Sequence, residues 1–464
     1  MTKKVNGFVM VVFMLILFGV LMTGIVGFGV MPHIPLFLCL ILLALFVFGH
    51  GASWETIEQG LIEGVTKGLK PVFILLLVGI VIGVWMVSGT VPYLVYLGFQ
   101  LVSPAWFLVT ALITTMIVST FAGSSFTTVG TVGAALMGIG IGFDIDPALC
   151  AGAIISGAMF GDKMSPLSDT TNFAPAVAGS DLFTHIRHML WTTVPAIIVT
   201  IVIFLSIGHT NNQVLNQNTI EGMTSALTNQ FNLSWVVMIS PLVVVVLAYL
   251  RFPILPVLVT GIITGGLTYL LVQPHATLKT LVTVMHGGMQ ADTGSEAVNE
   301  IVNRGGLVAM MSSISLIIIA LALGGVAYKT GLIDMMINKI VERLNRKGHF
   351  VTVTALSSVG VNLLTGEQYL SILLPGQTFK DSYTKQGIPH KTLSRTLEDA
   401  GTLVNPLVPW SVCGAFFSST LGVSVLDYLP FVFFLWLSPI FTIILGFLPQ
   451  SKQRATARES MSVR

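Results

Sequence analysis

Most of the chain consists of apolar stretches about as long as a lipid bilayer is thick. Eight of them are regular, and they cover residues 8–30, 34–49, 71–88, 189–208, 234–249, 253–272, 307–327 and 429–448. A helix needs about 20 apolar residues to span the hydrocarbon core. Charged residues make up only 9% of the chain, against about 25% in soluble domains. The sequence therefore predicts an all-α polytopic membrane protein.

Four further apolar segments are interrupted near their middle by Gly, Pro or polar residues. They cover residues 104–142, 147–180, 350–378 and 391–422. Non-helical backbone persists at membrane depth only where it is buried in protein or lines a cavity. We expect 147–180 and 391–422 to be broken helices that each cross once. We expect 104–142 and 350–378 to be re-entrant hairpins.

The basic residues indicate how these segments are oriented. With a cytoplasmic N-terminus, 19 of the 22 Lys and Arg residues face the cytoplasm, whereas only Lys279 and Arg304 face outward and Lys163 lies within the membrane. Such an excess is typical of cytoplasmic loops. The sequence thus predicts a multi-pass protein of the cytoplasmic membrane, with both termini inside and ten crossings plus two hairpins. Counting each hairpin as two crossings fits the charges equally well.

The two halves of the chain resemble each other at an offset of about 240 residues. SPL at 165–167 matches NPL at 405–407, and Gly123 matches Gly366. Matched loops differ in charge, since 92–103 has no basic residue and its counterpart 331–349 has four. This difference predicts two repeats of inverted topology, a feature of secondary transporters whose sites lie where helices break near the midplane. The alternative is that helices rich in small residues resemble each other by composition alone.

The repeat also predicts how the chain is divided. Residues 1–208 form the first half, with the first repeat beginning near residue 52. An extracellular linker loop follows at 209–233. Residues 234–450 form the second half, with the second repeat beginning near residue 277. Residues 451–464 form a cytoplasmic tail.

The first broken helix carries the sequence GDKMSPLSDTTN at 161–172. Pro166 removes a backbone donor and interrupts the helix, and oxygen-bearing side chains surround it. The candidate ion ligands here are Asp162, Ser165, Asp169, Thr170 and Asn172. Oxygen ligands suit hard cations, so we expect Asp162 and Asp169 to bind Na⁺. Burial disfavours a charged carboxylate and a bound cation favours it, so one carboxylate could exchange H⁺ for Na⁺. A simpler reading is that Asp162 and Lys163 neutralise each other.

The hairpin tips and the second break supply the remaining candidates. They are Ser124, Ser125 and Thr127 in the first tip, Thr365 and Glu367 in the second tip, and Glu398, Asp399, Thr402 and Asn405 before and at the break at Pro406. The alternative for single hydroxyl groups is hydrogen bonding between helices or to carbonyls. The clustering at repeat-related positions favours a binding site.

Some classes of activity are not supported by any motif. The chain contains no Gly-Lys dipeptide, so it lacks the Walker A loop that ATP-driven transport would need. No nucleophile–base pair or metal motif is found at membrane depth. We therefore expect a protein that is not an enzyme, has no cofactor and does not bind nucleic acid. A channel is the rival from another class, and the inverted repeats argue against it.

Three motifs resemble the NhaC family of Na⁺/H⁺ antiporters: GDKMSPLSDTTNFA (161–174), EQYLSILLPGQTF (367–379) and SRTLEDAGTLVNPLVPWSVCGAF (394–416). The resemblance implies an elevator-type transporter, in which a transport domain moves against a scaffold and external H⁺ is exchanged for internal Na⁺. The resemblance does not determine the oligomeric state, and a homodimer is one alternative. The family also includes malate–H⁺/Na⁺–lactate antiporters, so malate and lactate remain alternative substrates. Glu367-Gln368 departs from the Asp-Gln pair expected at the second tip.

Overall fold

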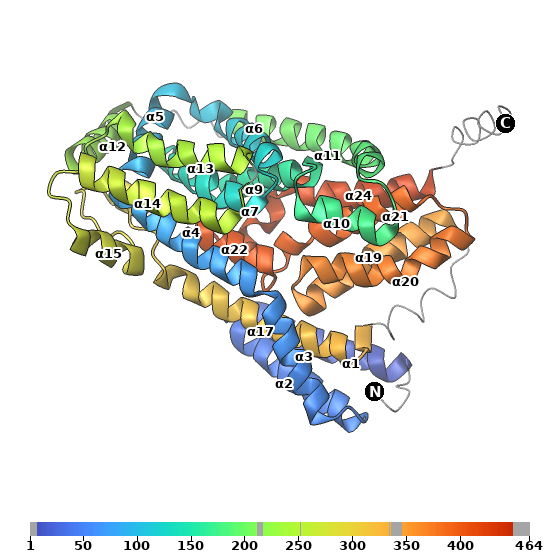
Figure 1. Cartoon of the computed structure of the whole chain (residues 1–464). Coiled ribbons are helices and arrows are strands. Elements are labelled where there is room, and N and C mark those ends of the chain that lie inside the picture. Colours follow the sequence, from blue (N-terminus) through green and yellow to red (C-terminus); the bar gives the residue numbers. More distant parts are fainter. Residues whose placement is uncertain (1–6, 211–216, 251, 334, 336–345, 449–464) are drawn as a thin grey trace.

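The computed structural model describes residues 7–210, 217–250, 252–333, 335 and 346–448, and no strand occurs among them (Figure 1). The prediction of an all-α membrane protein is confirmed. Seven helices are long and apolar enough to cross a membrane, or up to ten if each of three bent pairs is one span. The predicted cytoplasmic tail at 451–464 and the N-terminal residues 1–6 lie outside the described residues.

The helices follow one another along the whole described chain. In order they are α1 (Gly7–Met22), η1 (Thr23–Gly27), α2 (His33–Gly49), α3 (Trp54–Lys67), α4 (Leu69–Val87), α5 (Thr90–Leu101), α6 (Pro104–Ala122), α7 (Ser125–Thr128), η2 (Val129–Gly133), α8 (Ala134–Gly142), α9 (Pro147–Met164), α10 (Asp169–Ala178), α11 (Leu182–Thr210), α12 (Gln217–Gln230), η3 (Trp235–Met238), α13 (Ile239–Tyr249), α14 (Ile254–Val272), α15 (Leu278–Gly287), α16 (Glu296–Val302), η4 (Val308–Met310), α17 (Met311–Lys329), α19 (Lys347–Thr365), α20 (Gln368–Lys385), α21 (His390–Leu397), η5 (Glu398–Thr402), η6 (Asn405–Leu407), α22 (Val412–Leu421), α23 (Val425–Tyr428), η7 (Leu429–Phe431) and α24 (Phe433–Phe447).

Helices at repeat-related positions have equal lengths. α4 and α17 each have 19 residues, α6 and α19 each have 19, and α10 and α22 each have 10. α6 ends at Gly123 with φ of 65°, and α19 ends at Gly366 with φ of 63°. Left-handed backbone of this kind favours glycine. The match between Gly123 and Gly366 in the sequence thus corresponds to the same turn in both hairpins.

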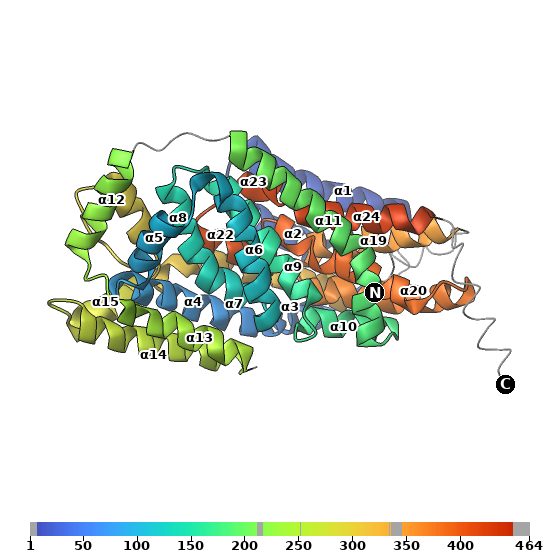
Figure 2. The same ribbon diagram turned by 90° about the horizontal axis from the view of Figure 1, so that it is seen from above.

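The two hairpins occupy opposite ends of the molecule. In Figure 2, α8 of the first hairpin lies at the end that also holds α5 and α12, whereas α20 of the second hairpin extends to the other end. Both hairpin tips lie near the centre, between these ends. This arrangement is the one that an inverted repeat requires.

The break in the first broken helix is stabilised by side chains from the helix that follows it. α9 ends at Met164, and α10 begins at Asp169. The Thr171 hydroxyl donates to the Lys163 carbonyl at 3.0 Å, and the Asn172 amide donates to the Pro166 and Ser168 carbonyls, both at 2.8 Å. Side chains of α10 thereby satisfy the Lys163 and Pro166 carbonyls at the break, whereas the Ser168 carbonyl also accepts from the Asn172 N–H.

The segment 209–233, predicted as an extracellular linker loop, is partly helical. α12 occupies Gln217–Gln230, and its Met223 and Leu227 are buried. Their spacing of four residues places them on one face of the helix, so a polar segment can still fold by packing that face on the molecule. Residues 211–216 lie outside the described residues.

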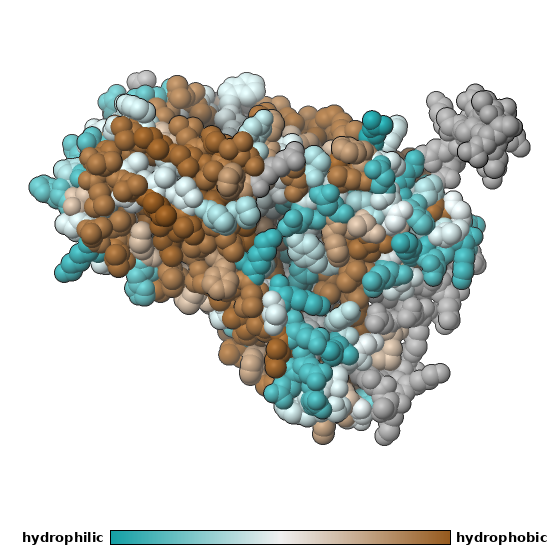
Figure 3. All heavy atoms as spheres, in the orientation of Figure 1, coloured by the Kyte–Doolittle hydropathy of each residue, from teal (hydrophilic) through white to brown (hydrophobic). Residues whose placement is uncertain are grey.

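The surface carries a wide apolar region. Figure 3 shows hydrophobic atoms covering the part of the molecule formed by α13 and α14. Exposed side chains there include Leu242, Val246, Ile263, Leu267 and Leu271. An apolar area of this size would promote aggregation in water. It is the expected surface of helices that face lipid.

Glycines allow α3 and α17 to pack closely, which generates a stability prediction. A Cβ added at Gly325 would lie 2.2 Å from the Gly60 carbonyl oxygen, whereas a Cβ at Gly360 of α19 meets nothing within 4 Å. Gly325→Ala should destabilise the protein by about 1–3 kcal/mol, as overpacking does. Gly360→Ala should be neutral or stabilising, because Ala favours helix by about 1 kcal/mol over Gly.

Thermal unfolding of both variants in detergent checks this prediction. Equal melting temperatures for Gly325→Ala and the unmodified protein would contradict the close packing of α3 on α17.

Candidate functional site

Asp162, in the last turn of α9, lies beside the tip of the first hairpin. The residue is 8% exposed, and its carboxylate Oδ2 accepts hydrogen bonds from the Ser125 backbone N–H at 3.0 Å and from the Ser125 hydroxyl at 2.6 Å. The first hairpin tip packs closely on the first break, since a Cβ added at Gly123 would lie 2.6 Å from the Leu167 Cβ. The structure thus brings together two residues that the sequence predicted for the site.

A cavity of about 310 Å³ lies in front of Asp162 and collects residues from both halves of the chain. Five predicted site residues line it: Ser124, Thr127, Asp162, Asp169 and Thr170. Other polar residues in its wall are Lys70, Ser168, Gln368 and Tyr369. The wall therefore combines the first hairpin tip, the first break and the start of α20.

Asp169 differs from Asp162 in its environment. Its side chain is 65% exposed, and its Oδ2 lies 3.3 Å from the Lys70 Nζ and 3.4 Å from the Tyr369 hydroxyl. Lys70 lies at the start of α4, and in the sequence it appeared only as one of many cytoplasmic basic residues. An exposed ion pair of this kind contributes roughly 0–1 kcal/mol. Asp169 therefore lies at the accessible side of the cavity.

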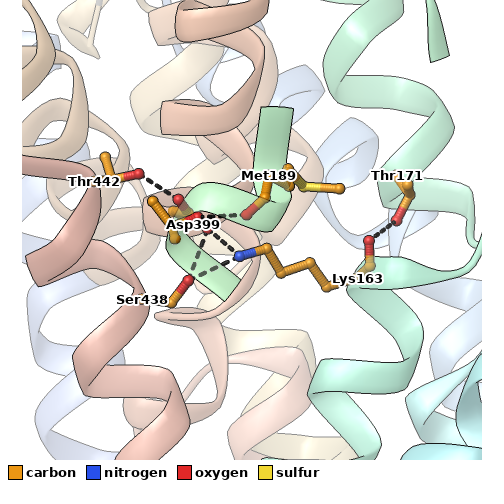
Figure 4. A network of polar contacts seen from close by, with 7 residues as sticks. Lys163, Thr171, Met189, Asp399, Ser438 and Thr442 are labelled. Atoms are coloured by element: carbon orange, nitrogen blue, oxygen red, sulfur yellow. Dashed lines mark hydrogen bonds and ion pairs between the residues drawn. The ribbon is translucent and has the colours of Figure 1, made fainter. Parts of the chain in front are cut away.

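Lys163 and Asp399 form a buried ion pair behind the cavity (Figure 4). Both side chains are fully buried. The Ser438 hydroxyl lies 2.8 Å from the Lys163 Nζ and 2.9 Å from Asp399 Oδ1, and the Thr442 hydroxyl donates to Asp399 Oδ2. The reading in which Lys163 neutralises its neighbour Asp162 is therefore wrong. The ion pair instead joins the first break to the π-helical turn η5 that precedes the second break.

Glu398, next to Asp399, is also fully buried. Neither of its carboxyl oxygens makes a hydrogen bond of acceptable geometry with the described residues, and the same holds for the Thr402 hydroxyl. The Thr170 and Thr402 hydroxyls lie beside it, and the charges of Lys163 and Asp162 act on it electrostatically. A carboxyl group in such surroundings is costly to ionise.

The predicted residues of the second tip and break have local partners. Glu367 caps α20 by accepting from the Leu370 N–H at 2.8 Å, and the Thr365 hydroxyl donates to the Val361 carbonyl at 2.8 Å. The Asn405 amide donates to Asn362 Oδ1 at 2.8 Å, and its Oδ1 accepts from the Cys413 N–H at 3.0 Å. These bonds maintain the shape of the second tip and break.

Ser165 and Pro406 lie within the breaks themselves. The Ser165 hydroxyl accepts from the Leu167 N–H at 3.3 Å, and the Pro406 carbonyl accepts from the Tyr428 hydroxyl at 2.7 Å. The Val412 N–H donates to the Gly366 carbonyl at 2.9 Å, so the second break packs on the second tip as the first break packs on the first.

The donor set of the cavity suits a small hard cation. Across the described residues, no group of three or more His, Cys, Asp and Glu side chains could hold a metal ion. The cavity instead offers one buried carboxylate, that of Asp162, together with several hydroxyl groups. Oxygen ligands with little charge are appropriate for a monovalent ion that must be released again.

Comparison with known proteins identifies the family. Residues 157–449 match the Na⁺/H⁺ antiporter family. The chain belongs to this family. It is 55% identical to the Na⁺/H⁺ antiporter NhaC of Alkalihalophilus pseudofirmus, over 94% of this chain and 95% of the relative. It is 45% identical to NhaC of Bacillus subtilis, over 90% and 92%.

A third relative is named for a different exchange. The malate-2H⁺/Na⁺-lactate antiporter of Bacillus subtilis is 34% identical over 91% of both chains. The predicted resemblance to the NhaC family is thus confirmed, and its organic-acid branch is a more distant relative.

The buried ion pair generates a prediction about stability. Lys163→Met leaves Asp399 without its counter-ion, and Asp399→Leu leaves Lys163 without one. Each single variant should lose about 3–5 kcal/mol, because an unpaired buried charge is expensive. The double variant should recover most of this loss, because two apolar side chains remove both charges together.

A double-mutant cycle of unfolding free energies in detergent measures this coupling. Additive losses in the double variant would show that the two residues do not interact as the structure has them.

Proposed function

We propose that the protein is a secondary antiporter that admits external H⁺ and expels internal Na⁺ across the cytoplasmic membrane, with Asp162 binding the two ions in turn. The observation that carries this proposal is the position of Asp162, a nearly buried residue in the wall of the cavity whose carboxylate is hydrogen-bonded to Ser125 of the first hairpin tip. Membership of the Na⁺/H⁺ antiporter family supports the choice of ions.

The coupling follows from competition for one carboxylate. A proton on Asp162 removes the negative charge that attracts Na⁺, and a bound Na⁺ disfavours protonation. The site therefore carries one ion or the other and changes sides only when its charge is neutralised. Ser124, Thr127 and Ser168, which line the same cavity, would complete the oxygen shell of Na⁺.

The other acidic residues receive different roles in this proposal. The oxygens of Asp399 are engaged by Lys163, Ser438 and Thr442, so Asp399 acts as the counter-ion of Lys163. Asp169 was expected from the sequence to bind Na⁺. Its exposure and its contact with Lys70 support a role at the cavity entrance, where it attracts cations. The termini are cytoplasmic in this proposal, and the protein is a transporter and not an enzyme.

Exchange of organic acids is the second candidate function. A cavity of about 310 Å³ is larger than a Na⁺ ion requires, and Lys70, Gln368 and Tyr369 in its wall are donors for a carboxylate substrate. The malate/lactate-exchanging relative supports this reading. Lys163 does not contribute here, because it is buried in its pair with Asp399.

Neutralising Asp162 and neutralising Asp169 should have different effects on Na⁺/H⁺ exchange. Asp162→Asn should abolish Na⁺-dependent ΔpH collapse in inverted vesicles, because the exchanging carboxylate is lost. Asp169→Asn should keep the maximal rate and raise the KM for Na⁺ several-fold, because only the attraction at the entrance is lost. Glu221→Gln, at an exposed position of α12, is the matched control.

Full exchange by Asp162→Asn, at normal expression, would remove Asp162 from the mechanism. Loss of exchange in Asp169→Asn alone would move the carrier role to Asp169.

Organic-acid exchange is tested in proteoliposomes that contain the purified protein. If the protein exchanges only cations, lactate outside should not accelerate efflux of radiolabelled malate, and Na⁺ should collapse ΔpH without either acid. Malate–lactate exchange that requires Na⁺ would favour the second candidate.

A further inference from the structure

Four basic residues from three helices meet at the end of the molecule that the sequence predicts to be cytoplasmic. They are His188 of α11, Lys347 at the start of α19, and Lys391 and Arg395 of α21. The three cationic side chains all act electrostatically on the His188 ring, and Arg395 also acts on Lys347. Residues that are far apart in the sequence thus form one group, which we call the basic cluster.

The basic cluster has no acidic partner of its own. Among the described residues no carboxylate forms an ion pair with any of its members. Asp399 acts on Arg395 and His188, but its charge already compensates Lys163. Arg395 is 3% exposed, and its Nε–H has no hydrogen-bond partner in the described part of the chain. Because a buried charge without a counter-ion is costly, an anion bound at the cluster would be stabilised.

The contacts of His188 fix the charge of the basic cluster. The Arg395 Nη1 donates to the His188 Nε2 at 3.2 Å, and the Thr392 hydroxyl lies 3.5 Å from the same nitrogen. A guanidinium group has only donors, so His188 Nε2 is the acceptor and the ring is neutral. The cluster therefore carries three positive charges. Lys347 and Lys391 are partly exposed, so an anion can reach them, whereas Arg395 adds its charge from beneath.

The basic cluster borders an apolar surface of α11. His188 and Trp191 are three residues apart, and Ile198 follows seven residues later, so all three lie on one face of the helix. Trp191 is 68% exposed and Ile198 is 55% exposed. α24 lies beside α11, with the Phe204 and Phe433 rings 5.2 Å apart (Figure 2). Trp side chains are enriched where the hydrocarbon core meets the lipid headgroups, which places the cluster at headgroup depth.

We propose that the basic cluster binds the phosphodiester headgroup of an anionic phospholipid, whose acyl chains lie along the exposed face of α11. Basic pockets between transmembrane helices on the cytoplasmic side recognise such headgroups. A zwitterionic headgroup is disfavoured, because it would bring its own ammonium group beside three cations. A free phosphate ion has the required charge but makes no use of the apolar face.

This inference does not depend on the proposed ion exchange. None of the four residues of the basic cluster lines the cavity that contains Asp162 and Asp169. Lipid binding can therefore be measured without any assay of transport.

Binding of short-chain phospholipids to the full-length protein in detergent tests the inference. Native mass spectrometry compares dioctanoyl phosphatidylglycerol, which is anionic, with dioctanoyl phosphatidylcholine, which is zwitterionic. The unmodified protein should bind the anionic lipid about tenfold more tightly. Lys347→Gln and Lys391→Gln should each weaken its binding about fivefold, the effect of one basic residue near a lipid surface. Both variants should bind phosphatidylcholine as the unmodified protein does, which also shows that they are folded.

Lys385→Gln, at an exposed position of α20, is the matched control and should bind both lipids normally. Equal affinity of the unmodified protein for the two lipids would overturn the inference. Normal phosphatidylglycerol binding by both Lys347→Gln and Lys391→Gln would also overturn it. Inorganic phosphate that displaces phosphatidylglycerol at equal concentration would identify a site for free anions and reject the lipid as its occupant.

Discussion

The buried ion pair between Lys163 and Asp399 joins the two interrupted helices of the protein. Lys163 lies just before the first break, and Asp399 lies in the π-helical turn before the second. Two charges without access to water must compensate each other, so the pair fixes how the halves meet. The backbone of Asp162 is fixed as a consequence, because Asp162 directly precedes Lys163 and its carboxylate reaches the first hairpin tip.

Four acidic residues near this junction differ mainly in what surrounds them. Asp399 has a cation and two hydroxyl groups as partners, and Asp162 has two donors from Ser125 and access to the cavity. Asp169 is exposed beside Lys70, and Glu398 is fully buried beside the Thr170 and Thr402 hydroxyls, with no cation of its own. Their chemistry is otherwise alike. The surroundings thus distinguish a buried, paired carboxylate, a carboxylate at the cavity, an exposed one and a buried, uncompensated one among four similar side chains.

Much of this arrangement could be predicted from the sequence, because its signals are local. Pro166 among polar residues in an apolar segment predicts a broken helix, and Gly123 and Gly366 are found at equivalent left-handed turns. The Lys163–Asp399 contact could not be predicted, since 236 residues separate the partners and no pattern links them. The different exposure of Asp162 and Asp169 could not be predicted from the sequence either. It arises because one lies in the last turn of α9 and the other begins α10.

Asp162 binds either a sodium ion or a proton in the proposed exchange. Isothermal titration calorimetry of Na⁺ binding to the purified protein, repeated in buffers of different ionisation enthalpy, measures this competition directly. If Asp162 is the shared site, Na⁺ binding should release protons, its affinity should weaken as pH falls, and Asp162→Asn should abolish the signal. Sodium binding that releases no protons and has the same affinity at every pH would contradict it.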